Sequence, residues 1–158
     1  MLNVVFTRID DRLIHGQVAT AWSKITKTNR IIVVDNAVAK DTFMEMVLKS
    51  AAPKGISVDV LTIEDAVPVI NGDDTGENVF ILAKTPQTIL ELIKAGVDLK
   101  QLNLGGMGAK AGRKQFYKNI SMSDEEREAF KEIMKNNVDV FVQIVPDAKQ
   151  ISIEKLLK

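Results

Sequence analysis

His15 is the only histidine among the 158 residues of this chain, and the chain has no cysteine. It lies in the segment 7–18, TRIDDRLIHGQV, which joins an apolar run to a helix-like run. One imidazole is therefore the leading candidate for nucleophilic chemistry at neutral pH. Two arginines and two aspartates precede it closely: Arg8, Asp10, Asp11 and Arg12. Because arginine donors match the oxygens of phosphate, this grouping indicates a phosphoryl site.

The residue types suggest how such a site would work. The helix that begins near Gln17 has free N–H groups in its first turn, and these favour an anion. Arg8 and Arg12 would add side-chain donors, and their positive charge would keep the imidazole neutral and nucleophilic. Asp10 or Asp11 could accept the N–H of the non-reacting ring nitrogen and so select one tautomer.

The same residues also have simpler interpretations. A lone histidine in a turn is more often solvated or capping, and Asp10 and Asp11 could simply form the turn. Both arginines could also be surface charges that pair with these aspartates, and such pairs contribute little to stability. Trp22 falls on an apolar helical stripe, which favours a core position. The run 105–108, GGMG, is most economically a flexible turn, although it could lie beside the site.

Apolar runs alternate with amphipathic helical patterns along the chain. The predicted strands are Leu2–Phe6, Arg30–Val34, Ile56–Thr62, Asn78–Ala83, Gln101–Leu104 and Val138–Val145. Helical patterns follow at residues 17–25, 43–50, 86–96 and 124–135, with a short terminal helix around 153–157. Several strands are apolar throughout, as expected when both faces are covered. The sequence therefore predicts one α/β domain over residues 1–158, an open doubly wound and mainly parallel sheet with helices on both faces.

Two regions leave more than one possibility. Residues 105–120 read as a loop followed by a short strand, with room for one antiparallel strand at the edge of the sheet. On the second predicted helix, Phe43, Met44 and Met46 could be core or interface, and their stripe favours core. The helix ends are clearer, because Thr85-Pro86 and Ser123 with Glu126 form typical starts.

Composition narrows the function classes. The charges of the 21 basic and 21 acidic residues cancel, so the net charge gives no indication of nucleic-acid binding. No signal peptide and no apolar run long enough to span a bilayer is present, which favours a soluble, intracellular protein. Walker and GxGxxG patterns are absent, and one histidine excludes a histidine-rich metal site. We therefore expect no metal and no cofactor.

Residues 8–18, RIDDRLIHGQV, resemble without interruption the active-site signature of the IIB subunits of the mannose/fructose/sorbose family of the bacterial sugar phosphotransferase system. The following ATAW, the IIVVD run at 31–35 and NLGGM at 103–107 are similar to the family too. The chain length fits an entire IIB domain, so the resemblance covers essentially all of it.

The resemblance implies a cytoplasmic phosphocarrier that associates with the inner face of the membrane through its transporter. A phosphorylated IIA protein, charged through HPr, would donate its phosphoryl group to Nδ1 of His15. A sugar would then receive it in the IIC and IID membrane subunits. Arg12 matches the arginine expected to hold the phosphoryl group, and Arg8 and Asp10 match the flanking polar positions. We expect the phosphate to lie among the backbone N–H groups of Leu13, Ile14, His15, Gly16 and Gln17.

We expect IIA to be a separate chain that docks around His15, because no IIA-like segment adjoins the signature. The sugar remains open among mannose, fructose, sorbose, glucose and amino sugars, because in this family its site lies mainly in the membrane subunits. The oligomeric state is open as well.

Two other classes of protein are alternatives to the phosphocarrier. A response-regulator receiver would share the fold and the acidic pair, but the third run ends in Val60-Leu61-Thr62-Ile63, without the phosphorylatable aspartate that a receiver carries at that point. A non-catalytic anion- or nucleotide-binding module would never be covalently modified.

Overall fold

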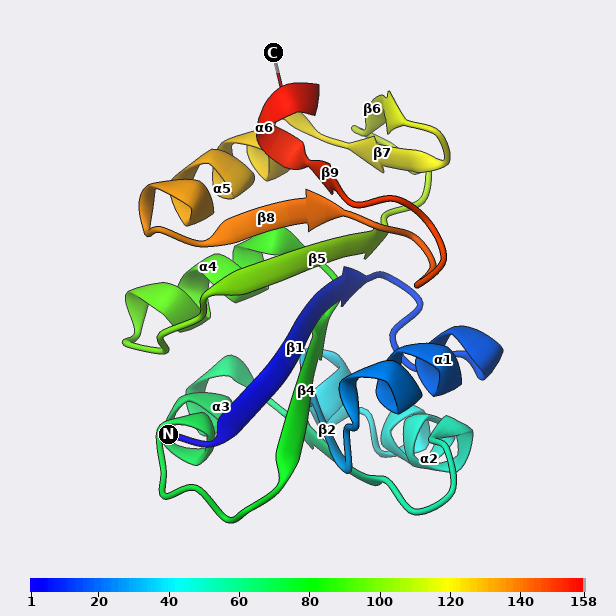
Figure 1. Cartoon of the computed structure of the whole chain (residues 1–158), viewed down its shortest axis with the longest axis vertical. Coiled ribbons are helices and arrows are strands. Elements are labelled where there is room, and N and C mark those ends of the chain that lie inside the picture. Colours follow the sequence, from blue (N-terminus) through cyan, green and yellow to red (C-terminus); the bar gives the residue numbers. More distant parts are fainter. Residues whose placement is uncertain (158) are drawn as a thin grey trace.

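Parallel strands connected by helices build most of this protein (Figure 1). The computed structural model describes residues 1–157. The strands are β1 (Asn3–Asp10), β2 (Arg30–Val34), β3 (Ser57–Leu61), β4 (Asn78–Ala83), β5 (Gln101–Gly106), β6 (Lys114–Tyr117), β7 (Ile120–Met122), β8 (Asp139–Val142) and β9 (Ile151–Ser152). Seven of them form one sheet in the order β3-β2-β4-β1-β5-β8-β9. All neighbours are parallel except β9, which runs antiparallel to β8.

Helices cover both faces of this sheet. They are α1 (Gly16–Thr26), α2 (Thr42–Ala51), α3 (Ile63–Ile70), α4 (Pro86–Lys94), α5 (Asp124–Lys135), α6 (Ile153–Leu156) and the 3-10 turn η1 (Val38–Lys40). One buried cluster joins the sheet to α3, α4 and α5, and a second joins it to α1 and α2. Figure 1 shows the two groups of helices on opposite sides. The predicted doubly wound α/β fold is confirmed.

Local sequence explains where the helices begin. Ser123 accepts the N–H of Glu126, whose side chain accepts the N–H of Ser123, so the predicted capping box opens α5. Pro86 takes the first position of α4 as predicted. The helix α3 was not predicted, because it is short and contains Pro68. Its start was still readable, since Thr62 accepts the N–H of Asp65.

The antiparallel edge strand exists, but the sequence placed it wrongly. It is β9 near the C-terminus, whereas β6 and β7 of the 105–120 region pair only with each other in a small separate sheet. The run 105–108 was also misread, because Gly105 and Gly106 belong to β5 rather than to a turn.

The core prediction for the second helix was wrong in part. Phe43 and Met46 are 68% and 65% exposed, and Val47 is exposed as well. Met44 and Leu48, on the other side of α2, pack into the cluster between the helix and the sheet. Because α2 is apolar on two sides, its periodicity alone could not identify the buried one.

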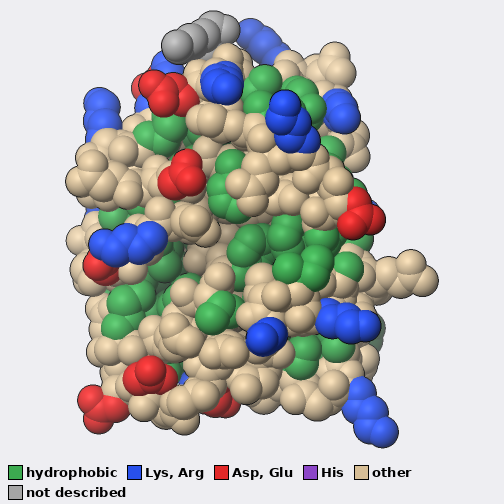
Figure 2. Space-filling model, viewed as in Figure 1, with side chains coloured by type: hydrophobic (Ala, Val, Ile, Leu, Met, Phe, Trp, Pro, Cys, Tyr) green, Lys and Arg blue, Asp and Glu red, His purple; other side chains and the backbone are tan. Residues whose placement is uncertain are grey.

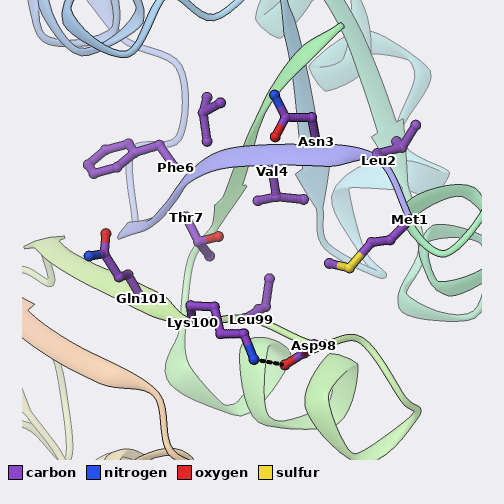
Figure 3. A pocket seen from close by; sticks show the side chains of 11 residues that line it. Met1, Leu2, Asn3, Val4, Phe6, Thr7, Asp98, Leu99, Lys100 and Gln101 are labelled. Carbon is purple, nitrogen blue, oxygen red and sulfur yellow. Dashed lines mark hydrogen bonds and ion pairs between the residues drawn. The ribbon is translucent and has the colours of Figure 1, made fainter. Parts of the chain in front are cut away.

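Strands β1 and β5 pair only from Arg8 and Asn103 onward. Toward their amino ends they diverge around a groove of about 370 Å³, where an exposed Lys100–Asp98 ion pair lies (Figure 3). At their carboxyl ends they converge. After β1 the chain continues into α1 on one face of the sheet, whereas after β5 it continues through β6 and β7 into α5 on the other face. These converging carboxyl ends are therefore the switch point where α/β sheets bind ligands.

The surface carries no single-sign field on the face drawn in Figure 2, where Lys and Arg side chains alternate with Asp and Glu. No helix within residues 1–157 is both long and apolar enough to cross a membrane.

Candidate active site

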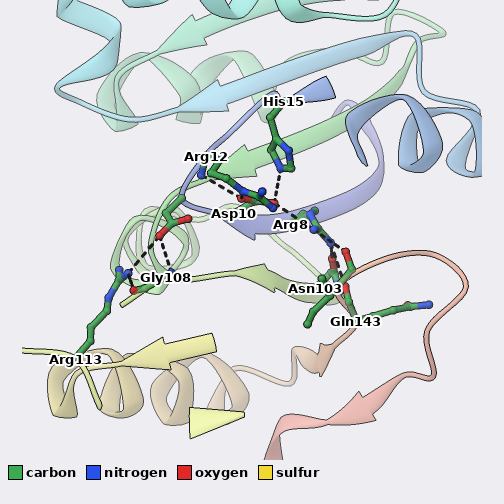
Figure 4. Close-up of polar contacts among 10 residues, drawn as sticks. Arg8, Asp10, Arg12, His15, Asn103, Gly108, Arg113 and Gln143 are labelled. Atoms are coloured by element: carbon green, nitrogen blue, oxygen red, sulfur yellow. Dashed lines mark hydrogen bonds and ion pairs between the residues drawn. The ribbon is translucent and has the colours of Figure 1, made fainter. Parts of the chain in front are cut away.

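The candidate site lies at the carboxyl end of β1, where the chain turns into α1 (Figure 4). The prediction ended this strand at Phe6, but it continues through Asp10, and Thr7 to Asp10 are buried. The turn itself adopts unusual backbone geometry, because Leu13 has a φ of 58° and Gly16 a φ of 45°. His15 is then the N-cap residue of α1. The polar residues of the site therefore lie in a short segment between the buried end of β1 and the start of α1.

Asp10 is the aspartate that contacts the histidine. Its Oδ2 lies 2.9 Å from Nε2 of His15, and its side chain is only 1% exposed. Burial by itself would raise the pKa of this carboxyl. The hydrogen bond from His15, the Arg12 N–H and the charge of Arg8 together hold that pKa below its ordinary value. An ionised carboxylate only accepts hydrogen bonds, so Nε2 of His15 is the donor, and in the neutral form of the ring the lone pair then lies on Nδ1.

Arg8 supports Asp10 from inside the protein. Its Nη2 donates to Asp10 Oδ2 at 3.2 Å and to the carbonyl of Ile144 at 2.9 Å. Its Nη1 donates to Asn103 Oδ1 at 2.6 Å and to the carbonyl of Gln143 at 3.1 Å. Burial lowers the pKa of this guanidinium, and Asp10 opposes that effect. Because the side chain is only 2% exposed and its terminal nitrogens are occupied, Arg8 orients Asp10 rather than reaching an incoming phosphate.

Two glycines of β5 make room for this buried pair. A Cβ at Gly105 would overlap the Arg8 guanidinium, and one at Gly106 would lie 2.8 Å from Asp10 Oδ1. The sequence indicated that these glycines could lie beside the site, but not that the two positions have no room for a side chain. Asn103, also missed, carried a signal: it is a polar residue inside an otherwise apolar strand pattern.

Trp22 is a core residue, as predicted, with 5% exposure. Its ring stacks on Phe6 with centroids 4.6 Å apart, and the Arg8 guanidinium lies 5.3 Å from the ring centroid. A small cavity beside it is also lined by His15 and Asp10. The single tryptophan therefore borders the candidate site directly.

Several backbone N–H groups next to His15 in the chain are free. Among residues 1–157, no acceptor is present for the N–H groups of Ile14, His15, Gly16, Gln17 and Val18. The first turn of α1 contains no acidic residue to neutralise its positive end. Leu13 does not fit the predicted set, because its N–H already donates to the carbonyl of Asp10 at 2.9 Å. The donor set is shifted by one residue toward the helix.

Arg12 is the accessible arginine of the site. Its side chain is 60% exposed, and its Nε lies 3.5 Å from Asp10 Oδ1. Its backbone N–H donates to the same oxygen at 3.1 Å. The remaining guanidinium donors have no acceptor among the described residues, so they are available to bind an incoming anion. His15 itself has a 22% exposed side chain, which leaves the ring accessible from outside.

Comparison with known proteins agrees with this geometry. A sequence model of the family described as "PTS system sorbose subfamily IIB component" matches residues 4–158. The sorbose-specific EIIB component of Klebsiella pneumoniae is 37% identical over 153 residues, covering 96% of this chain and 93% of that protein. The mannose-specific EIIAB component of Escherichia coli strain K12 is 36% identical over 151 residues, covering 95% of this chain and 47% of that protein.

A solved structure gives the same result. The crystal structure of the IIBSor domain of the sorbose permease from Klebsiella pneumoniae superposes with a TM-score of 0.94 at 36% identity. The alignment covers 98% of this chain and 96% of that one. The fold is that of a phosphotransferase-system component. The chain belongs to the sorbose subfamily of its IIB components.

Proposed function

We propose that this protein carries a phosphoryl group on Nδ1 of His15, accepting it from phospho-IIA and passing it on during sugar uptake through IIC and IID. Membership of the IIB family supports phosphoryl transfer in general. The observation that carries the finer proposal is the 2.9 Å contact between His15 Nε2 and the Asp10 carboxylate. This contact supports a tautomer that is protonated on Nε2, in which Nδ1 would be the nucleophile.

The transfer step follows from this tautomer. The lone pair of Nδ1 forms the new N–P bond while the N–P bond of the donor phosphohistidine breaks and its electron pair returns to the donor ring. The His15 ring gains positive charge as it attacks. Because the Asp10 carboxylate accepts the Nε2–H, it stabilises that charge without taking the proton.

The bound phosphoryl group would be held by the free N–H groups of residues 14–18 and by Arg12. These donors are present before the reaction, so little reorganisation is needed when charge arrives. A cradle built mainly from neutral N–H groups stabilises the phosphoryl group without trapping it. Onward transfer to a sugar remains feasible for that reason.

The partners follow from the chemistry. Donor and acceptor histidines must approach closely, so we place the IIA-docking face around His15 and Arg12, both of which are accessible. Contact with the membrane subunits would bring the protein to the cytoplasmic face of the membrane. The sugar would be bound by those subunits.

The test is intact-protein mass after incubation with enzyme I, HPr, phosphoenolpyruvate and a matching IIA at alkaline pH. We expect addition of one phosphoryl group, stable in alkali and lost in acid. His15→Ala should remain unmodified and folded, since the His15 side chain is partly exposed and its loss removes one hydrogen bond. Phosphoryl uptake by His15→Ala would refute the assignment of the acceptor. Acid-stable modification would point to different chemistry.

A further inference from the structure

Arg113 is a buried arginine outside the histidine turn, with a side chain that is 2% exposed. In the chain it directly precedes β6, at the end of the loop that follows β5. Its Nε and Nη2 donate to the two carboxylate oxygens of Glu126 at 2.9 and 2.8 Å. Its Nη1 donates to the carbonyl of Gly108 at 2.8 Å and lies 3.4 Å from Asp11 Oδ2. One guanidinium thus connects helix α5, the loop after β5 and the turn that carries His15. Figure 4 shows Arg113 beside Gly108 of this loop.

Asp11 is joined to the last residue of β5 and to the loop after it by two further hydrogen bonds. Its N–H donates to the carbonyl of Gly106 at 3.0 Å, and its Oδ2 accepts the N–H of Gly108 at 2.8 Å. Asp11 therefore does not contact His15. It attaches the histidine turn to the loop after β5, and Arg113 supplies the charge that faces its carboxylate.

The other end of Arg113 is held by a rigid element. Glu126 is the third residue of α5, and its Oε1 also accepts the N–H of Ser123 in the capping box. The fork of Arg113 can therefore not follow Asp11 if the turn moves, because two parallel hydrogen bonds fix it to the helix. The arrangement is a clamp between α5 and the turn.

We propose that Arg113 is a positioning residue for phosphoryl transfer, acting through Asp11 on the turn between β1 and α1. The proposal rests on the function proposed for His15. Asp11 lies between Asp10, which orients the imidazole, and Arg12, which reaches the phosphoryl group. Residues 11–15 belong to no helix or strand, so their position depends on such contacts. Small displacements of reacting groups slow a transfer strongly.

A purely structural role for Arg113 predicts a different result. Loss of its contacts would then lower stability and leave the transfer rate of the folded protein unchanged. The chain offers a matched control in Arg30, the first residue of β2, whose guanidinium pairs with Asp59 of β3 and with Glu77 just before β4 and does not contact the turn. Arg30→Gln removes a comparable arginine–carboxylate network without touching the turn.

The experiment compares Arg113→Gln, Asp11→Asn, the double variant and Arg30→Gln at a temperature where all are folded. Single-turnover phosphoryl uptake from phospho-IIA gives the rate, and amide hydrogen exchange at Asp11 and Gly108 reports the clamp. We expect each single clamp variant to be slower by roughly ten- to a hundredfold. The double variant should be no slower than the slower single, because both remove one interaction. Arg30→Gln should transfer at the wild-type rate.

Wild-type transfer by folded Arg113→Gln would overturn the proposal, and so would rate losses that multiply in the double variant. If the wild-type protein accepts no phosphoryl group, the function proposed for His15 fails by itself. The exchange data then decide the clamp separately. Faster exchange of Gly108 and Asp11 in Arg113→Gln would support it, and unchanged protection would refute it.

Discussion

At the scale of single residues, the two arginines of the site, Arg8 and Arg12, have different roles although the sequence does not distinguish them. Arg8 is buried and makes four hydrogen bonds within the protein, whereas Arg12 is 60% exposed and keeps free donors. Between them, Asp10 is held tightly enough to stay ionised although it is buried. Arg8 and Asp10 can therefore select one tautomer of the imidazole without contacting the phosphoryl group proposed to bind there.

Asp10→Asn tests this tautomer control. An amide at this position loses the negative charge that stabilises the ring during attack, so we expect phosphoryl uptake to fall by roughly a hundredfold. Nitrogen NMR of the single histidine should also show a larger share of the tautomer protonated on Nδ1. Asp98→Asn, which removes an exposed carboxylate near the amino ends of the strands, serves as the control. Equal rates in both variants would remove Asp10 from the mechanism.

Arg12→Gln and Arg8→Gln should separate chemistry from support. Arg12→Gln removes an exposed side chain, so stability should change by less than about 0.5 kcal/mol while phosphoryl uptake slows. Arg8→Gln breaks a buried charge network, for which a loss of about 3–5 kcal/mol is expected. Chemical denaturation and single-turnover kinetics measure the two effects. An Arg12→Gln protein that transfers at the wild-type rate would leave the phosphoryl group without its proposed arginine.

At the scale of elements, the carboxyl end of β5 packs against the charged end of β1. Gly105 and Gly106 occupy strand positions where a side chain would meet Arg8 and Asp10. Their absence of side chains explains how a strand can end in an arginine and an aspartate that are both buried. Glycine here provides space for a neighbouring side chain rather than backbone freedom.

Gly105→Ala should therefore act on the site from a neighbouring strand. The new methyl group overlaps the Arg8 guanidinium, so Arg8 must move and release hydrogen bonds to Asp10 and Asn103. We expect a loss of about 1–3 kcal/mol in unfolding free energy and slower phosphoryl uptake. Gly108→Ala is the matched control, since its Cβ would lie 3.6 Å from Asp11 Oδ2, an ordinary contact. A Gly105→Ala protein as stable and active as Gly108→Ala would contradict this account.

At the scale of the whole molecule, the sequence predicted what periodicity and local signals encode. Arg30–Val34 and Asn78–Ala83 were predicted as strands with the bounds that the structure gives, because both are apolar throughout. The end of β1 was missed because its last residues are polar, and only long-range partners such as Asn103 and Gly105 make their burial possible. The role of Arg113 was hidden for the same reason, since it depends on residues 102 positions earlier and 13 positions later.

The stability of the whole molecule should also depend on the buried carboxylates. Burial alone would raise the pKa of both Asp10 and Glu126. Hydrogen bonds, from His15 to Asp10 and from Arg113 and the Ser123 N–H to Glu126, instead hold each pKa below its ordinary value. A lowered pKa in the folded state stabilises the protein above the pKa of the unfolded chain, near 4, and this contribution is lost as the pH falls through the lower folded value. The unfolding free energy should therefore be flat near neutrality and decline below about pH 4.5.

Denaturant unfolding at a series of pH values measures this decline. Asp10→Asn and Glu126→Gln should each be less stable than wild type at neutral pH but lose less stability on acidification, because one linked carboxylate is gone. Each unit by which a folded pKa is lowered corresponds to about 1.4 kcal/mol of pH-dependent stability. Asp98→Asn removes an exposed carboxylate and should keep the wild-type decline. If Asp10→Asn and Glu126→Gln also keep it, the acid sensitivity must arise elsewhere, and the two buried charge networks would not couple the site to the stability of the fold.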